Sequence, residues 1–309
     1  IIIGFSRIDK PISETLPPIY FNAQNMKFIP LFFAVVLVLV ISCSIKNDPN
    51  SKEWQQLFNG KDLNGWTPKI RGYALGENFG NTFHVDSGRM IVGYDAYDSF
   101  NYRYGHIFYK EKYSHYLLAV EYRFRGNQCT GGEDWALRNS GAMLHCQAPE
   151  TMLKNQDFPI SIEAQFLGGL GTGPRSTANL CTPGTEVFMA DTLFTPHCIN
   201  SNSKTYDGDQ WVRVELLVLG DSLIRHIVDG TPVLEYSKPR IGGGVVNDFD
   251  PAQKIDGKVL TEGFIALQSE SHPIEFRKVE LLNLKGCMDP NAANYKSYYV
   301  RHDPDACQY

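Results

Sequence analysis

The segment Tyr116-Leu-Leu-Ala-Val-Glu-Tyr-Arg-Phe124 decides the fold class of this chain. Its large apolar side chains occupy the even-numbered positions from Tyr116 to Phe124, whereas Glu121 and Arg123 fall on the other face. A period of two residues is that of a β-strand with one buried face. The segment therefore predicts a strand in a sheet that covers an apolar core.

The same pattern recurs along the chain. Residues 212–218 alternate after Trp211, and the runs 224–228 and 233–236 flank Asp229-Gly230, a hairpin signal. Residues 263–270 and 274–284 resemble two more strands, and long helical periodicity is absent. Many strands between turns rich in Gly, Pro and Asp predict an all-β chain built as a two-sheet sandwich or jelly roll. The stretch 168–206 has few apolar runs and is predicted to form long loops near one end or one face of it.

The composition excludes one class of function. The formal net charge is −5 and no basic block occurs, so the chain has no electrostatic footprint for nucleic acid. Aromatic residues make up 12% of the chain beside 27 Gly and 17 Pro, which favours a turn-rich β protein.

Residues 26–44, MKFIPLFFAVVLVLVISCS, have the parts of an export signal. Lys27 supplies a positive charge, residues 28–41 are apolar but short for a membrane span, and Val-Ile-Ser-Cys at 40–43 resembles a bacterial lipobox. We therefore expect a signal peptide at 26–42, lipid on Cys43, a linker at 43–52 and anchoring in a bacterial cell envelope. Ser44 carries no acidic retention signal, which favours the outer membrane. Residues 1–25 are interpreted as upstream sequence wrongly joined to the gene. An uncleaved apolar anchor is the alternative.

Six cysteines remain beside Cys43, and an even number in an exported chain predicts disulfides. Cys287 and Cys307 bracket the end of the chain and are expected to pair with each other. The other four allow three pairings, among which the sequence does not choose: Cys129, Cys146, Cys181 and Cys198. A zinc site is the competing interpretation, but no C-x-x-C spacing supports it.

Residues 285–309 are predicted to form a separate Cys-bounded C-terminal unit. They resemble short cysteine-bounded repeats with a GC-x-DP-x-A-x-NY core. Asp289, Asp303 and Asp305 are candidate ligands for calcium. The alternative is solvated turn aspartates beside a disulfide.

A series of short motifs carries a family resemblance. In order they are LFNGKDLNGW at 57–66, FHVDSGRMIV at 83–92, HIFYK at 106–110 followed by the strand at 116–124, NSG at 139–141, IEAQ at 162–165, QW at 210–211, DG at 229–230, GFIALQ at 263–268 and EFR at 275–277. Their number and order resemble the 3-keto-disaccharide hydrolase family. The resemblance implies a concanavalin A-like jelly roll over residues 53–284 and action on sugars oxidised at C3. Some members of that family are described as lyase-hydratases.

The chemistry of such a substrate defines the groups required. A ketone at C3 of a glycoside acidifies the C2–H bond, so a base can start elimination of the C1 substituent, and water can add afterwards. In Ile160-Ser-Ile-Glu-Ala-Gln-Phe166 only Glu163 offers a carboxylate, whereas a retaining glucanase would carry several on one strand face. Glu163 is therefore the first catalytic candidate, as base or metal ligand, and Gln165 on the same face is a substrate-binding candidate. An ordinary solvated strand face is the alternative.

The segment Asn139-Ser-Gly-Ala-Met-Leu-His145 supplies further candidates. A period of two places Asn139, Gly141 and His145 on one face, where Gly141 would let a ligand or another backbone approach. We expect His145 to be catalytic and Asn139 to bind substrate. Arg138 is expected to fix sugar hydroxyls or an enolate. A structural histidine is the alternative for His145.

A third cluster lies in Gln268-Ser-Glu-Ser-His272. Gln268 and Glu270 share a face and are substrate-binding candidates, and the family resemblance places a Gln and a His in this region. His272 is a catalytic candidate. If the three strands are neighbours, Glu163, His145 and His272 would converge, either as base and acid or as ligands of a divalent metal that polarises the C3 ketone.

Aromatic and cationic residues complete the candidate site. Trp135 lies in a polar loop and is a candidate for stacking on a sugar ring. Trp66 and Trp211 are expected to pack in the structure. Lys204 and Tyr206 are predicted to line the mouth of the site.

Three functions compete for this sequence. The first is an envelope lipoprotein that cleaves 3-keto-glycosides by elimination or net hydrolysis, and the family motifs favour it. The second is a non-catalytic carbohydrate-binding lipoprotein on the same fold, which would tolerate Glu163→Gln. The third is a structural surface protein that uses its C-terminal unit for interaction. The sequence leaves the aglycone and the oligomeric state open.

Overall fold

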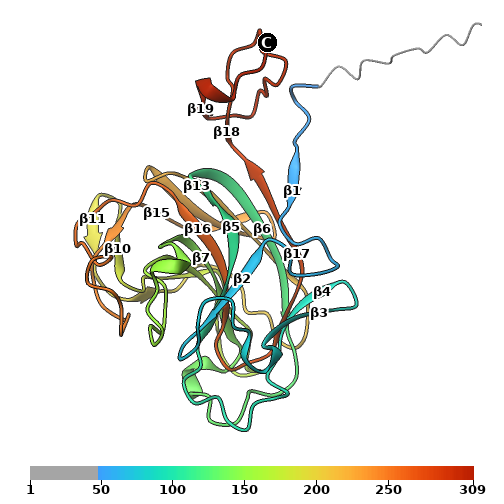
Figure 1. Cartoon of the computed structure of the whole chain (residues 1–309), viewed down its shortest axis with the longest axis vertical. Coiled ribbons are helices and arrows are strands. Elements are labelled where there is room, and N and C mark those ends of the chain that lie inside the picture. The colour runs from blue at the N-terminus through green and yellow to red at the C-terminus, as the bar shows by residue number, and fades with distance from the viewer. Residues whose placement is uncertain (1–47) are drawn as a thin grey trace, which may run out of the picture. The chain divides into compact units, whose positions relative to one another are not determined.

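The computed structural model describes residues 48–309, which consist almost entirely of strands and connecting loops (Figure 1). The predictions for residues 1–25, for the signal at 26–42 and for Cys43 fall outside the described residues. Within residues 48–309, no helix is long and apolar enough to cross a membrane.

Two antiparallel sheets form the sandwich, which confirms the predicted all-β jelly-roll class (Figure 1). The ten-stranded sheet has the order β11-β10-β15-β14-β13-β6-β17-β4-β3, with β1 added on β17. Its strands are β1 (Trp54–Gln56), β3 (Phe83–Asp86), β4 (Arg89–Val92), β6 (His115–Phe124), β10 (Thr185–Met189), β11 (Thr192–Phe194), β13 (Val212–Leu219), β14 (Leu223–Val228), β15 (Thr231–Ile241) and β17 (Ile274–Asn283).

The seven-stranded sheet has the order β12-β9-β8-β7-β16-β5-β2. Its strands are β2 (Trp66–Ile70), β5 (Gly105–Tyr113), β7 (Asn139–Cys146), β8 (Ile162–Leu167), β9 (Asn179–Cys181), β12 (Cys198–Ile199) and β16 (Gly263–Ser269). Short 3₁₀ turns interrupt the loops: η1 (Phe79–Asn81), η2 (Asp134–Ala136), η3 (Pro149–Thr151) and η4 (Pro304–Ala306).

Strand β6 behaves as its alternation predicts. All five of its even-numbered apolar side chains are buried in the main core. Glu121, on the other face, accepts hydrogen bonds from Arg213 at 3.1 Å and from Arg277 at 2.6 Å. A charged ladder therefore covers the outer face of the ten-stranded sheet while the inner face packs.

The seven-stranded sheet closes the same core from the opposite side. On β8, Ile162, Ala164 and Phe166 are fully buried in it, and the Phe166 ring stacks on Tyr122 of β6 with centroids 4.4 Å apart. Because successive side chains of a strand point to opposite faces, Glu163 and Gln165 lie on the outer face of this sheet. That face carries the candidate site.

The structure confirms the predicted hairpin turn but differs from the prediction of long loops. The predicted hairpin joins β14 to β15, and both Asp229 and Gly230 have positive φ, 49° and 77°, as a tight two-residue turn requires. The stretch 168–206, expected to be loops, instead contributes β9 and β12 to one sheet and β10 and β11 to the other. These strands have only two to five residues, too few to show a period of two.

The cysteines pair in part. Cys287 bonds to Cys307, as predicted. Cys181 bonds to Cys198, and this second disulfide ties β9 to β12. Cys129 is half-buried and Cys146 is buried, and both are free thiols. Disulfides therefore close one loop on the seven-stranded sheet and the C-terminal unit.

In the C-terminal unit, β18 (Lys285–Gly286) pairs in parallel with β19 (Arg301–His302). Asp303 forms an ion pair with Lys285 at 3.1 Å, and Asp289 accepts a hydrogen bond from the Tyr309 hydroxyl. These aspartates already have protein partners, and calcium binding by Asp289, Asp303 and Asp305 stays a prediction.

The two tryptophans expected in packing roles do pack. Trp66 is buried and donates its indole N–H to the Leu57 carbonyl at 2.8 Å. Trp211 is half-buried, with the guanidinium groups of Arg123 and Arg277 each 4.5 Å from its ring centroid.

Candidate functional site

Glu163 projects from the centre of the seven-stranded sheet on its outer face. It pairs with Met143 of β7 and with Cys181 of β9, and its side chain is only 5% exposed. A Cβ built on Gly141 of β7 would lie 2.5 Å from Glu163 Oε1. The Glu163 carboxylate therefore lies directly over Gly141, and the missing side chain there makes room for it.

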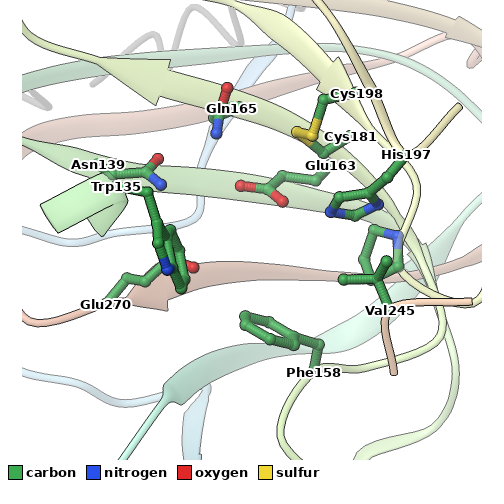
Figure 2. Close-up of a pocket in the computed structure, with 11 residues that line it drawn as sticks. Trp135, Asn139, Phe158, Glu163, Gln165, Cys181, His197, Cys198, Val245 and Glu270 are labelled. Atoms are coloured by element: carbon green, nitrogen blue, oxygen red, sulfur yellow. A yellow bond between two sulfur atoms is a disulfide. The ribbon is translucent and has the colours of Figure 1, made fainter. Parts of the chain in front are cut away.

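A pocket of about 330 Å³ opens above this carboxylate (Figure 2). Figure 2 shows the Glu163 side chain pointing into the space between Trp135 on one side and His197 and Val245 on the other. The lining comes from strands β7, β8, β9 and β12 and from six connecting segments: Trp135, Asn139, Phe158, Glu163, Gln165, Cys181, Pro183, His197, Cys198, Val245 and Glu270. The structure thus brings together five residues proposed from the sequence, namely Glu163, Gln165, Asn139, Glu270 and Trp135.

Two carboxyl groups in this pocket have displaced pKa values. Burial raises the pKa of Glu163 to about 8. Burial raises the pKa of Glu270 well above its usual value, and the nearby charges of Glu163 and Glu133 raise it further. A pair of buried carboxyls of this kind can supply one base and one acid. Burial therefore favours the protonated form of both carboxyls, and ionisation of Glu163 opposes that of Glu270.

Amide groups flank the carboxyls. Asn179 donates a hydrogen bond to Gln165 Oε1 at 3.1 Å, which leaves the Gln165 amide nitrogen as a donor for the pocket. Asn139 is 2% exposed, and its Oδ1 has no partner in the structure. Buried polar atoms are nearly always hydrogen-bonded in the state that functions. These two side chains are suited to sugar hydroxyls.

The sequence of residues 53–282 matches the profile of the family described as the 3-keto-alpha-glucoside-1,2-lyase-like domain. The chain belongs to this family. The match marks the lyase-like domain as carbohydrate-active and spans nearly the whole sandwich. None of the curated proteins searched matches the chain.

Solved structures offer remote likenesses to the lyase-like domain. A Parabacteroides distasonis protein described as a glycosyl hydrolase has 16% identity and a TM-score of 0.45, covering 75% of this chain and all of its own. A Bacillus licheniformis β-glucanase has 10% identity and a TM-score of 0.40, covering 76% and 100%. A carbohydrate-binding module from Bacillus subtilis has 10% identity and a TM-score of 0.35, covering 71% and 96%. The family assignment rests on the sequence match alone.

His145 does not join the site, which corrects the predicted convergence. Phe264 pairs with Cys146 and Ala266 with Met143, so β7 has one residue more than β16 between these pairs. Such a β-bulge breaks the alternation of side chains, and His145 has a positive φ of 49° there. Its Nε2 lies 3.0 Å from the Gly220 carbonyl, in a separate pocket bordered by residues 258–263.

His272 and Arg138 lie together in another pocket, of about 370 Å³, bordered by Gln128 and Asp207. Both ring nitrogens of His272 lack partners, and its ring lies edge-on to Phe124 at 5.6 Å. Burial and the neighbouring Arg138 lower the pKa of His272 to about 4, so it is neutral at pH 7. Arg138 forms an ion pair with Asp209 at 3.4 Å. Neither residue lines the Glu163 pocket.

Gln268 and Lys204 occupy opposite extremes of exposure. Gln268 is fully buried opposite His106 in the seven-stranded sheet, and both atoms of its amide lack partners. The Lys204 side chain is 69% exposed and pairs with Asp229 at 3.3 Å. Neither Lys204 nor Tyr206 is among the residues that line the Glu163 pocket, and the Tyr206 hydroxyl donates to Asp229 at 2.6 Å.

The proposed metal ligands do not form a common site. Among Glu163, His145 and His272, only Glu163 lines the pocket. Within residues 48–309, the one close group of three ligand-type side chains is Cys181, His197 and Cys198. Two of these sulfurs form a disulfide and are not thiolate ligands. Glu163, His145 and His272 therefore do not form the metal-binding set expected from the sequence.

Sequence reasoning missed the residues that loops bring to the pocket. Phe158, His197 and Val245 come from three separate loops, and His106 lies beneath Phe158 with ring centroids 5.9 Å apart. Burial lowers the pKa of His197, so its imidazole is neutral. The one available signal was the position of His197 directly before Cys198.

Proposed function

We propose that this chain cleaves 3-keto-glycosides by base-initiated elimination, with hydration as a following step that makes the net reaction a hydrolysis. The observation that carries the proposal is the pair of buried carboxyls, Glu163 and Glu270, that line one pocket and whose pKa values are both raised by burial. The family match supports the substrate class.

In the proposed reaction Glu163, once ionised, removes the proton from C2. The C–H electron pair forms the C2–C3 double bond of an enolate, and the negative charge moves to the C3 oxygen. Collapse of the enolate restores the C3 ketone, forms the C1–C2 double bond and breaks the bond from C1 to the glycosidic oxygen. Glu270 gives its proton to that departing oxygen, so the aglycone leaves as an alcohol. Solvent exchange returns both carboxyls to their starting states.

The amides position the sugar while this occurs. The Gln165 amide nitrogen and Asn139 face the same space as Glu163 and can bind hydroxyls or the C3 oxygen. Raised pKa values favour this chemistry, because a carboxylate that ionises near pH 8 is a stronger base than an ordinary glutamate. Ordinary retaining hydrolysis requires a carboxylate nucleophile beside C1 instead.

The test is turnover of a 3-keto-glucoside and of its unoxidised parent by residues 44–309, expressed in an oxidising compartment. We expect release of aglycone from the keto substrate only, with a fall in kcat of about 10²- to 10⁴-fold in Glu163→Gln. Glu270→Gln should slow substrates with poor leaving groups most. A parallel incubation with chelator tests metal dependence. Release from both substrates, or unchanged turnover in Glu163→Gln, would refute the mechanism.

A non-catalytic carbohydrate-binding function is the second candidate. It is favoured by Trp135, whose half-exposed ring stacks on Tyr104 and offers an apolar face for a sugar. It predicts affinity for unoxidised glycosides without release of aglycone, and no loss of that affinity in Glu163→Gln.

We also propose that the protein is exported and held to the cell envelope by lipid on Cys43. The lipobox-like sequence at 40–43 motivates this, and the disulfides Cys181–Cys198 and Cys287–Cys307 are typical of oxidising compartments. Labelling cells with a fatty acid should mark the wild-type protein, and Cys43→Ser should abolish the label. A label that survives this substitution would exclude Cys43 as the anchor.

A further inference from the structure

The Glu163 pocket has two zones of opposite character. Its floor is polar and comes from the sheet, through Glu163, Gln165, Asn139 and Glu270. Its walls are mostly apolar: loops supply Trp135, Phe158, Pro183 and Val245, and strands β9 and β12 supply the Cys181–Cys198 disulfide. The proposed reaction uses only the floor, so the walls need a separate explanation.

One wall is a fixed stack of aromatic rings. Tyr104 stacks on Trp135 with centroids 6.2 Å apart, and it lies 4.9 Å from Phe158. The Tyr104 hydroxyl donates to Glu133 at 2.8 Å, which sets the orientation of its ring. Trp135 is nevertheless 52% exposed. A rigid aromatic surface left open beside a polar floor is ready to pack against an apolar group.

The opposite wall holds a strained residue. Val245 has φ of 57°, a left-handed conformation that β-branched residues rarely adopt, and it is 49% exposed. The next residue, Val246, is buried with Ile160 and Ile241, and the Gly244 carbonyl accepts a hydrogen bond from Gly184 at 2.8 Å. The backbone on both sides of Val245 is thus fixed, and it holds this apolar side chain at the pocket despite the strained φ angle. Strain of this kind accumulates at ligand sites.

The walls lack partners for a second sugar ring. A sugar in this zone would bring several hydroxyl groups, each of which needs a hydrogen-bond partner when buried. Among the described residues of the walls, the His197 imidazole and the indole N–H of Trp135 are the side-chain groups that can form hydrogen bonds. An aromatic or aliphatic group needs no such partners and would gain from covering Trp135, Phe158 and Val245.

We propose that these walls bind the aglycone, and that the substrates are 3-keto derivatives of glycosides with an aromatic or other apolar aglycone, in preference to disaccharides. This inference rests on the proposed function, because it places the sugar over Glu163. It predicts which leaving group the enzyme accepts.

The experiment compares 3-keto 2-phenylethyl glucoside with a 3-keto glucosyl-glucose of the same anomeric configuration. Phenylethanol is a poorer leaving group than a sugar hydroxyl, so faster cleavage of its glycoside can only reflect binding. We expect kcat/KM to favour the phenylethyl substrate by about 10- to 100-fold, as burial of one ring would give. Equal values, or a preference for the disaccharide, would overturn the inference while leaving the proposed function intact.

Variant Val245→Asn locates the effect. Asparagine tolerates positive φ, so the variant should fold, but it replaces the apolar side chain. We expect the preference for the phenylethyl substrate to fall about tenfold. The matched control is Val259→Asn, because Val259 is 47% exposed and lies away from this pocket, and it should retain the wild-type preference.

A binding measurement separates this inference from the reaction. Calorimetry with unoxidised 2-phenylethyl glucoside and methyl glucoside requires no turnover. Tighter binding of the phenylethyl glucoside, weakened in Val245→Asn, would support the apolar site even if no 3-keto substrate is cleaved. Indistinguishable affinities would refute it. Failure of wild-type protein to cleave any 3-keto substrate would refute the proposed function instead.

Discussion

Replacing Gly141 by alanine tests whether the placement of the Glu163 carboxylate controls the reaction. The added Cβ would lie 2.5 Å from Glu163 Oε1 and 2.8 Å from its Cγ, whereas ordinary contacts begin at 3.4 Å. The Glu163 side chain would therefore have to move by about 1 Å, and a displacement of that size costs about 100-fold in rate when the group must meet a reacting atom. Nothing in the variant alters the chemistry of the carboxylate itself.

The assay is kcat for a 3-keto-glucoside, with thermal unfolding measured on the same samples. Overpacking of this kind destabilises by about 1–3 kcal/mol, which should lower the melting temperature without preventing folding. Gly244→Ala is the control, because a Cβ there meets nothing within 4 Å. A folded Gly141→Ala protein with wild-type kcat would refute the argument that Glu163 acts from its observed position.

Three further predictions concern the Glu163 carboxyl, the Cys181–Cys198 disulfide and Lys204. Burial raises the pKa of Glu163 from its usual 4.5 to about 8. Between these two pH values the folded protein keeps a proton that the unfolded chain has lost. This carboxyl therefore lowers the free energy of unfolding as the pH rises from 4.5 to 8. Glu163→Gln should therefore have a higher melting temperature than wild type at pH 8 and the same melting temperature below pH 4. The kcat/KM of the wild-type protein should rise towards pH 8. Removal of the Cys181–Cys198 disulfide by double alanine substitution should cost about 3 kcal/mol and several-fold in kcat, since the bond holds the wall at His197. Lys204→Ala should leave KM unchanged, because its exposed side chain lies outside the pocket.

Each of these has a distinguishing control. For the first prediction, differential scanning calorimetry across pH is the measurement, and a Glu163→Gln melting temperature no higher than that of wild type at pH 8 would contradict it. For the second, the Cys287–Cys307 pair has a similar separation, 20 residues against 17, but lies in the C-terminal unit, so its removal should cost similar stability and no activity. Equal activity losses in both variants would point to general destabilisation. A raised KM in Lys204→Ala would return that residue to the site.

The sequence predicts the sandwich well because its evidence is local and repeated. The alternation in β6 and β8 determines which side chains reach the core, and for that reason Glu163 and Gln165 lie on the outer face as expected. One inserted residue is enough to defeat the same rule at His145, since periodicity does not reveal a bulge that depends on pairing with β16.

The pocket walls were beyond reach for a different reason. Phe158, His197 and Val245 belong to loops that meet only after both sheets have formed, and no spacing in the chain connects them. Gly141 was expected to admit a ligand or a backbone, but it admits the Glu163 side chain, a contact set by the register of β7 against β8. Register depends on long-range pairing, which a single sequence does not record.

The burial of Glu163 and Glu270 bears on how such domains diverge. Two buried carboxyls make the fold less stable at neutral pH than amides of the same shape would, so mutations that replace them are favoured when only stability is selected. Descendants that are no longer selected for turnover would lose these glutamates early. Their folded state would become more stable while the pocket remained. Under the proposed function, lineages that bind glycosides without cleaving them should therefore arise repeatedly from catalytic ancestors, and the reverse change should be rare.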